Sequence, residues 1–178
     1  VGDRLGLPNG WLNTDFMKTS SYTPKLIQYS KYYKTFSNVL RVRTVSAEYL
    51  IVMKLMAGRQ YKNDLSDVVG ILLEQQNNGK KIHLDDIKRV ADDLYGGYDK
   101  IPESSRIFIE ATYQNLDLEE LYKKIREDER QNKDILLEFQ DHYPEVLNGD
   151  NLADILKAAK ARKNATFPPL DAYADHNV

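Results

Sequence analysis

The stretch AEYLIVMKLMAG, residues 47 to 58, decides the fold that we expect of this chain. It is apolar around nearly its whole circumference, and a helix of that kind is normally buried, so we predict that it forms the centre of a helical core. Ser46 is a suitable N-cap and Gly58 a suitable stop. The run contains one lysine, and a buried ammonium is costly without an anionic neighbour. We therefore expect Lys54 to contact a carboxylate just beyond Gly58.

A β-hairpin is predicted before this helix and further helices after it. The segment YYKTFSNVLRVRTVS, residues 32 to 46, is rich in β-branched and aromatic residues, and Ser37-Asn38 can turn the chain at its centre. The fold class is therefore α+β, a small β element followed by a mainly helical C-terminal region. We expect the polar run REDERQNKD, residues 126 to 134, to project into water or to break its helix. Amphipathic periodicity predicts helices near residues 63–76, 84–95, 104–114, 118–143 and 152–162.

Composition narrows the classes of protein to consider. The 178 residues include no cysteine, which excludes disulfides, thiolate catalysis and cysteine zinc sites. No apolar run approaches the roughly 20 residues that cross a bilayer, so we expect no membrane partner and a cytoplasmic protein. Because the chain opens at Val1 without an initiator methionine, we expect a processed or truncated piece of something longer.

Positive charge is concentrated in the first part of the chain. The formal net charge is −2, yet residues 18–62 carry nine lysines and arginines against the single acid Glu48. A patch of one sign favours nucleotides, nucleic acid or an acidic partner. In YSKYYKTF, residues 29 to 36, aromatic rings can stack on bases while lysines meet phosphates, which suits RNA. The alternative is a strand with core aromatics and solvated lysines. The candidate nucleic-acid contacts are Lys31, Lys34, Arg41 and Arg43.

A second group of charged residues lies within fourteen residues of sequence, at Lys54, Arg59, Lys62, Asp64 and Asp67. The two aspartates are three apart at the start of a predicted helix, so they share one face. Cations can meet the phosphates of a nucleoside triphosphate while carboxylates hold magnesium or activate a hydroxyl. The alternative is structural: the aspartates are ordinary helix N-terminal charges and the lysine extends to the surface.

The run VSAEYLIVMKLMAGRQYKNDLSDVVGILLE, residues 45 to 74, resembles the second half of a bacterial nucleotidyltransferase-like family of unknown function. It is similar more distantly to the abortive-infection nucleotidyltransferase toxins of toxin–antitoxin systems, whose pattern is a helical Lys, then Arg, then Asp-x-x-Asp. With GLPNGWLN included, the resemblance covers residues 5 to 98. It implies that Lys54, Arg59 and Lys62 contact nucleotide phosphates and that Asp64 and Asp67 form the catalytic pair. It also implies Mg²⁺ and a nucleoside triphosphate as cofactors of the intact parent protein.

The chain departs from this family at the metal-binding motif. Such enzymes begin with a Gly-Ser or Gly-Gly turn and a strand bearing Asp-x-Asp, and no Asp-x-Asp occurs in this sequence. The predicted hairpin has Arg41 and Arg43 where many relatives place a third carboxylate. We therefore expect residues 1–76 to be the C-terminal half of a nucleotidyltransferase-like domain, residues 77–165 a helical region and residues 166–178 an extended or disordered tail.

Two functions follow from these observations. The first is nucleotidyl transfer to an RNA or protein acceptor in the intact parent, with this fragment catalytically silent. The alternative is a non-catalytic helical binding or dimerisation module that recognises nucleic acid or an acidic protein partner. A homo-oligomer fits the second function. No metal ligands are predicted in this chain itself.

Overall fold

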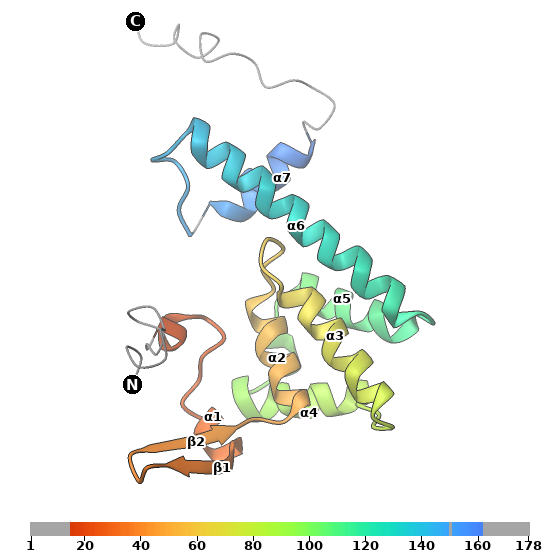
Figure 1. Cartoon of the computed structure of the whole chain (residues 1–178). Helices are drawn as coiled ribbons and strands as arrows, with labels where there is room; N and C mark the ends of the chain where they lie inside the picture. Colours follow the sequence, from red (N-terminus) through yellow and green to blue (C-terminus); the bar gives the residue numbers. More distant parts are fainter. Residues whose placement is uncertain (1–14, 150, 162–178) are drawn as a thin grey trace, which may run out of the picture.

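The computed structural model describes residues 15–149 and 151–161, in which a two-stranded hairpin leads into a set of packed helices (Figure 1). The predicted α+β class is thereby confirmed. The predicted tail 166–178 and the segment GLPNGWLN lie outside the described residues. The elements are α1 (Leu26–Tyr29), β1 (Lys31–Phe36), β2 (Leu40–Thr44), α2 (Ala47–Ala57), α3 (Asp64–Asn77), α4 (Leu84–Tyr95), α5 (Glu103–Gln114), α6 (Leu118–His142) and α7 (Leu152–Ala161), with 3₁₀ helices at Asp15–Lys18 and Tyr98–Lys100.

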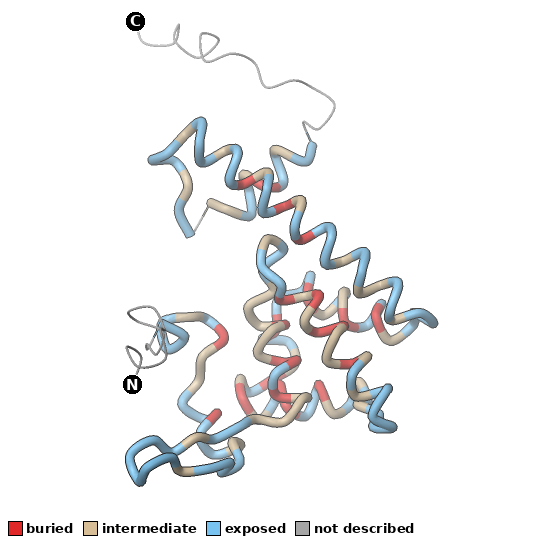
Figure 2. The backbone as a smooth tube through the Cα atoms, viewed as in Figure 1, coloured by how far each residue is buried: buried red, intermediate tan, exposed pale blue. Residues whose placement is uncertain are grey.

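Helix α2 lies at the centre of the core, as its apolar sequence predicts. Ile51, Val52 and Leu55 are fully buried, and α2 packs against α3, α4 and α5. Figure 2 shows buried residues gathered on these helices, whereas the hairpin is exposed over most of its length. The predicted apolar stripe of α4 faces the same core through its buried residues Ile87, Val90, Ala91 and Leu94.

Helix α6 corrects one sequence prediction. It runs without a break from Leu118 to His142, packs alongside α3 and contacts α7 with its second half (Figure 1). The polar run 126–134 neither breaks the helix nor projects wholly into water, because Glu129 and Asn132 are buried against the start of α3. Burial of these two polar side chains is tolerated because each one has a hydrogen-bond partner.

The two ends of α2 show how the sequence sets its boundaries. Gly58 ends the helix in the left-handed conformation, with φ +52°, and its amide donates to the carbonyl of Lys54, as expected of a glycine stop. Ser46 occupies the N-cap position, but its hydroxyl donates to Glu48 Oε1 at 2.7 Å and caps no backbone amide. The predicted boundary is right, although the capping bond expected there is not made.

The hairpin has the predicted turn. Ser37 and Asn38 both have positive φ, 49° and 55°, which matches the right-handed twist of the strands on either side. The strands pair antiparallel with Phe36 opposite Leu40, and the register shifts between Tyr32 and Lys34. None of the described helices is long and apolar enough to cross a membrane.

Candidate functional site

A compact charge cluster joins the end of α2 to the start of α3. The Nζ of Lys54 lies 3.1 Å from Oδ1 of Asp64 and 2.8 Å from Oδ2 of Asp67. From the turn between the helices, Nε of Arg59 donates to Oδ2 of Asp64 at 2.7 Å. The expected contact between Lys54 and a carboxylate beyond Gly58 is thus confirmed, and both aspartates take part in it. Four of the five residues that the sequence groups together meet here.

Asp64 is the anchor of this cluster. Its side chain is 1% exposed and accepts hydrogen bonds from Lys54 Nζ and from the Nε, Nη2 and backbone amide of Arg59. Burial alone would raise the pKa of the Asp64 carboxyl, but the bonds from Arg59 and Lys54 outweigh it and hold this pKa below its ordinary 3.8. Asp64 is therefore an ionised, fully hydrogen-bonded carboxylate at neutral pH.

Lys54 and Asp67 are more accessible than Asp64, with side chains 36% and 37% exposed. Burial opposes the charged form of Lys54, but hydrogen bonds to Asp67 and Asp64 prevail, so the pKa of Lys54 is raised. Lys62 lies outside the cluster: its Nζ is 6.0 Å from the centre of the Tyr61 ring. The cluster thus consists of two cations and two carboxylates in mutual contact.

A further carboxylate near this turn, that of Glu129, was not predicted from the sequence. Glu129 of α6 is 3% exposed, and its Oε1 accepts the backbone amide of Leu65 at 2.8 Å. Longer bonds of 3.4 Å come from the amide of Ser66. Burial raises the pKa of Glu129 above its ordinary 4.5, and these amide bonds lower it only in part. A carboxylate from a distant helix therefore caps the N-terminus of α3.

Asn132, one turn after Glu129, completes this contact. Its side-chain amide donates to the carbonyl of Gln60 at 2.7 Å, which ties α6 to the turn between α2 and α3. A signal for both residues exists in the sequence, because Ile125, Glu129, Asn132 and Leu136 are spaced by four, three and four. Two polar residues at inward positions of an otherwise apolar stripe indicate buried partners.

The basic residues of the hairpin divide between its two faces, with Arg41 and Arg43 on one and Lys31 and Lys34 on the other. Paired residues of an antiparallel ladder project to the same side and neighbours along a strand alternate, so the register sets which side chains lie together. Arg41 lies opposite Thr35 and Arg43 opposite Tyr32, and the Tyr32 hydroxyl contacts Thr35 Oγ1 at 3.2 Å across this face. The Nε of Arg43 donates to Ser30 Oγ at 2.6 Å, and its Nη2 donates to the carbonyl of Ser30. Arg43 is therefore oriented, whereas Arg41 extends from the strand.

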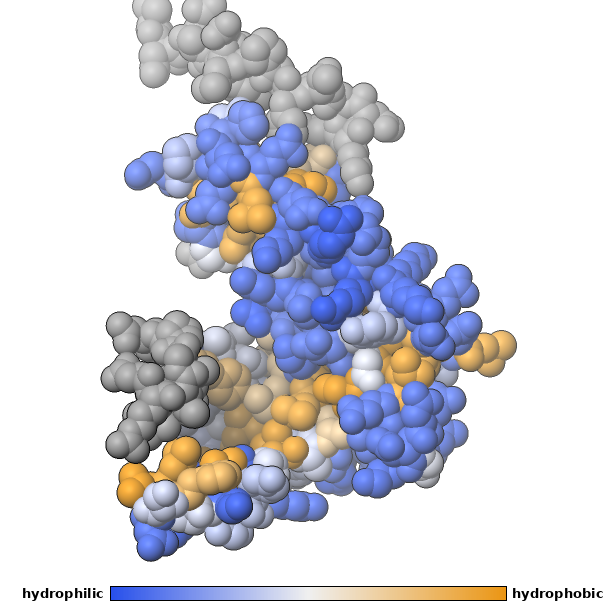
Figure 3. All heavy atoms as spheres, in the orientation of Figure 1, coloured by the Kyte–Doolittle hydropathy of each residue, from blue (hydrophilic) through white to orange (hydrophobic). Residues whose placement is uncertain are grey.

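The opposite face of the hairpin is mixed. Lys34 lies opposite Val42, and Phe36 opposite Leu40, with the Nζ of Lys34 5.1 Å from the centre of the Phe36 ring. Figure 3 shows hydrophobic side chains at this end of the molecule that no other described element covers. The interpretation of this strand as one with core aromatics is wrong, because Tyr32, Tyr33 and Phe36 are 59%, 65% and 43% exposed.

The four candidate nucleic-acid contacts therefore share one small, exposed element. Lys31, Lys34, Arg41 and Arg43 are all exposed along β1 and β2. Among the described residues none of the four forms an ion pair, and Glu48, the single acid of residues 18–62, lies in the first turn of α2 and accepts from Ser46.

A metal site is not formed by the described part of the chain, which holds no group of three or more His, Asp or Glu residues with suitable geometry. Comparison of the whole chain with family models, with characterised proteins and with solved structures finds no match. The function of this protein is therefore inferred from its own residues and contacts.

Proposed function

We propose that this chain is a non-catalytic module that binds single-stranded or structured RNA through its β-hairpin. The observation that carries the proposal is the exposure of four basic side chains together with the rings of Tyr32 and Tyr33 on the same two strands. Aromatic rings stack on bases without regard to their sequence, and Lys and Arg meet the phosphates between them. Exposed rings on a strand otherwise cost solubility, so a binding role gives them a physical reason.

The arrangement on the hairpin supports a nucleic-acid ligand over an apolar one. Arg43 is held in place by Ser30, so one guanidinium is oriented before any ligand arrives. Tyr33 lies at the register shift between Tyr32 and Lys34, where the ladder is interrupted, and it is the most exposed ring of the hairpin at 65%. Arg41 extends from the same face as Arg43. Together these residues offer cations at fixed spacing and a ring that a base can reach.

In this proposal the charge cluster of Lys54, Arg59, Asp64 and Asp67 has a structural role. The carboxylate of Asp64 already accepts four hydrogen bonds, and the nearest oxygens of Asp67 and Asp64 are 2.8 and 3.1 Å from Lys54 Nζ. Mg²⁺ requires oxygen ligands with free lone pairs, so this donor set does not fit the ion without displacing Lys54 and Arg59. We therefore assign no step of catalysis to Asp64 or Asp67 in this chain.

Nucleotidyl transfer remains the second candidate, favoured by the meeting of Lys54, Arg59, Asp64 and Asp67 at one turn. In that case a longer parent would supply the Asp-x-Asp strand, and a nucleoside triphosphate with Mg²⁺ would draw the two cations away from Asp64. The candidates differ in what the purified chain does. A binding module binds RNA without any further part of a longer protein. An enzyme transfers nucleotide only when the Asp-x-Asp strand is present.

The test of the proposal is fluorescence anisotropy with a labelled oligouridine at low salt. The variant Lys31→Glu, Lys34→Glu, Arg41→Glu should lose binding. A matched control with the same charge change, Lys80→Glu, Lys81→Glu, Lys124→Glu, places the charges on exposed residues away from the hairpin and should retain binding. No RNA binding by the unaltered protein, or equal loss in both variants, would contradict the proposal.

A further inference from the structure

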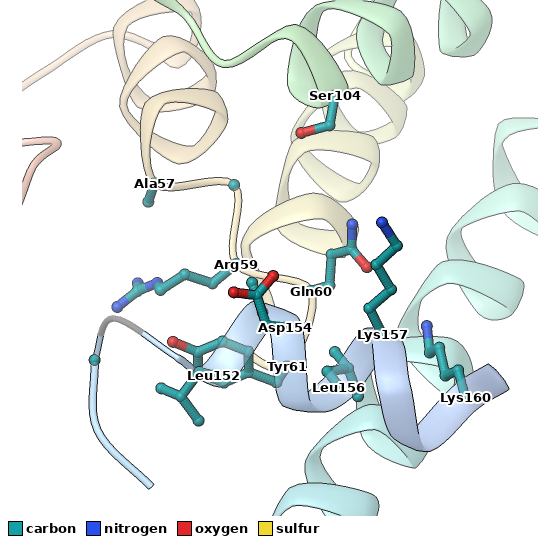
Figure 4. Close-up of a pocket in the computed structure, with 13 residues that line it drawn as sticks. Ala57, Arg59, Gln60, Tyr61, Ser104, Leu152, Asp154, Leu156, Lys157 and Lys160 are labelled. Carbon is teal, nitrogen blue, oxygen red and sulfur yellow. The ribbon is translucent and has the colours of Figure 1, made fainter. Parts of the chain in front are cut away.

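A cavity of about 550 Å³ lies between the turn that follows α2 and the helix α7 (Figure 4). This volume is within the range of about 300 to 1,000 Å³ that is typical of small-molecule sites. The turn contributes Arg59, Gln60 and Tyr61, and α7 contributes Lys157 and Lys160. The cavity is separate from the hairpin and forms no part of the RNA-binding proposal.

The polar lining of this cavity is mainly cationic. Arg59, Lys157 and Lys160 line it against a single carboxylate, that of Asp154. Lys157 and Lys160 are three residues apart on one face of α7, and within the described ranges neither forms an ion pair. Their positive charge is therefore available to an anion.

Arg59 connects the cavity to the charge cluster. Its Nε and Nη2 bind Asp64, and no acceptor among the described residues bonds its Nη1. Asp64 thus orients the guanidinium by one edge and leaves Nη1 free to donate to a polar group of a ligand. The hydrogen bond to Asp64 raises the pKa of Arg59, and burial lowers it by less. The pKa is therefore raised, and the guanidinium stays positive.

The cavity also has an aromatic and apolar part. In Figure 4, Tyr61 lies near Leu152 and Arg59, while the ammonium groups of Lys157 and Lys160 lie on the other side with the amide of Gln60. The Nζ of Lys62 is 6.0 Å from the centre of the Tyr61 ring. Tyr61 is half-buried, and a planar base can stack on the accessible part of its ring while its phosphates reach the cations.

We propose that this cavity binds a small nucleoside phosphate, with the phosphates at Lys157 and Lys160 and the base against Tyr61. Charge, volume and the ring agree on this class of ligand: a metal cation would be repelled, and a purely apolar ligand would bury Lys157 and Lys160 without partners. The binding requires no chemistry at Asp64, and it does not depend on RNA binding at the hairpin.

The test uses isothermal titration of the full chain with ATP, without added metal and at low ionic strength. One saturable site is expected, with pyrophosphate binding more weakly and adenosine binding weakest. The double variant Lys157→Glu, Lys160→Glu should lose roughly tenfold or more in affinity, because each lysine donates to a charged acceptor. Lys124→Glu, an exposed lysine of α6 outside the cavity, should stay within about twofold.

Two further variants make the outcome decisive. Tyr61→Ala should weaken ATP binding and leave pyrophosphate binding unchanged. The hairpin variant Lys31→Glu, Lys34→Glu, Arg41→Glu should bind ATP as the unaltered protein does. The proposal is overturned by the absence of saturable ATP binding, by unchanged ATP affinity in the α7 double variant, or by an equal loss in Lys124→Glu. Pyrophosphate that binds as tightly as ATP would overturn the assignment of the base to Tyr61.

Discussion

Lys54 and Asp64, ten residues apart in sequence, form an ion pair of 3.1 Å in which the carboxylate is buried and the ammonium half-buried. The pair closes the turn between α2 and α3 and explains why an apolar helix can carry a lysine near its end. The same turn also receives Arg59 on Asp64 and Glu129 on the first amides of α3. One short connection is thus held by charged groups from three elements, each with its partners in place.

Removal of the Asp64 charge should destabilise the protein more than removal of the Lys54 charge. Asp64→Asn leaves Lys54 and Arg59 without their buried partner, and we expect a loss of roughly 2 to 4 kcal/mol in the free energy of unfolding, discounted because both cations reach water. Lys54→Met keeps apolar contacts and leaves Asp64 bound to Arg59, so the loss should be about 1 kcal/mol or less. Urea denaturation measures both. Equal losses would contradict the assignment of Asp64 as the anchor.

Acid should weaken this cluster through Asp64. The pKa of Asp64 in the folded protein is lowered from its ordinary 3.8 by Arg59 and Lys54 in spite of burial, so its stabilising contribution is present above pH 3.8 and is lost as the pH falls through the folded value. Asp64→Asn should therefore remove part of the stability loss seen below pH 3.8. Denaturation curves across this range, compared with Asp128→Asn at an exposed position of α6 outside the cluster, decide the point.

Glu129 should behave in the opposite sense. Burial raises its folded pKa above 4.5, so the folded state favours the protonated acid, and stability from this group is present below pH 4.5 and falls as the pH rises through the folded value. Glu129→Gln should flatten the dependence of stability on pH just above 4.5.

Glu129→Ala leaves the amides of Leu65 and Ser66 buried without their acceptor, which typically costs about 1 to 3 kcal/mol. A glutamine variant as unstable as the alanine variant would contradict the capping role.

Much of this fold could be predicted because local signals and burial agree. Gly58 and the turn at Ser37-Asn38 set boundaries by backbone conformation alone, and the apolar sequence of α2 places it in the core. The pairing of Lys54 also followed, since its partners lie close in sequence. The spacing on α6 indicates that Glu129 is buried, but its partners could not be placed in this way, because they lie more than sixty residues away. The cavity beside α7 was equally hidden, because it depends on how α7 packs on α6.

Gly58 should be sensitive to substitution for two separate reasons. Its φ is +52°, and a Cβ at this position would lie 2.5 Å from Oγ of Ser105, which is buried. We expect Gly58→Ala to cost roughly 2 to 4 kcal/mol, from the left-handed conformation together with overpacking. Gly79 is the matched control, since its φ is +69° and a Cβ there would have no atom within 4 Å beyond the glycine itself and its two neighbours in the chain. Gly79→Ala should cost only about 1 kcal/mol. Similar losses at both glycines would show that Ser105 moves aside freely.

The purified chain should transfer no nucleotide. It lacks Asp-x-Asp, and its two candidate catalytic carboxylates are occupied by Lys54 and Arg59. The measurement is incubation with each radiolabelled nucleoside triphosphate, Mg²⁺ and a mixture of RNA and protein acceptors. Transfer that disappears in Asp64→Ala, with the variant still folded by circular dichroism, would favour the second candidate function over the first.

RNA binding by the hairpin should weaken steeply with salt, and the slope should count its phosphate contacts. For single strands the logarithm of affinity falls against the logarithm of salt concentration with a slope of about −0.7 per phosphate neutralised. If Lys31, Lys34 and Arg41 each meet one phosphate, replacing all three by glutamine should reduce the slope by about 2. Tyr33→Ala should instead lower affinity at every salt concentration by the loss of stacking, roughly 1 to 3 kcal/mol, with the slope unchanged. Two results would place the RNA elsewhere on the protein. One is a salt slope that the triple glutamine variant leaves unchanged, and the other is an equal change of slope in Tyr33→Ala and in the triple glutamine variant.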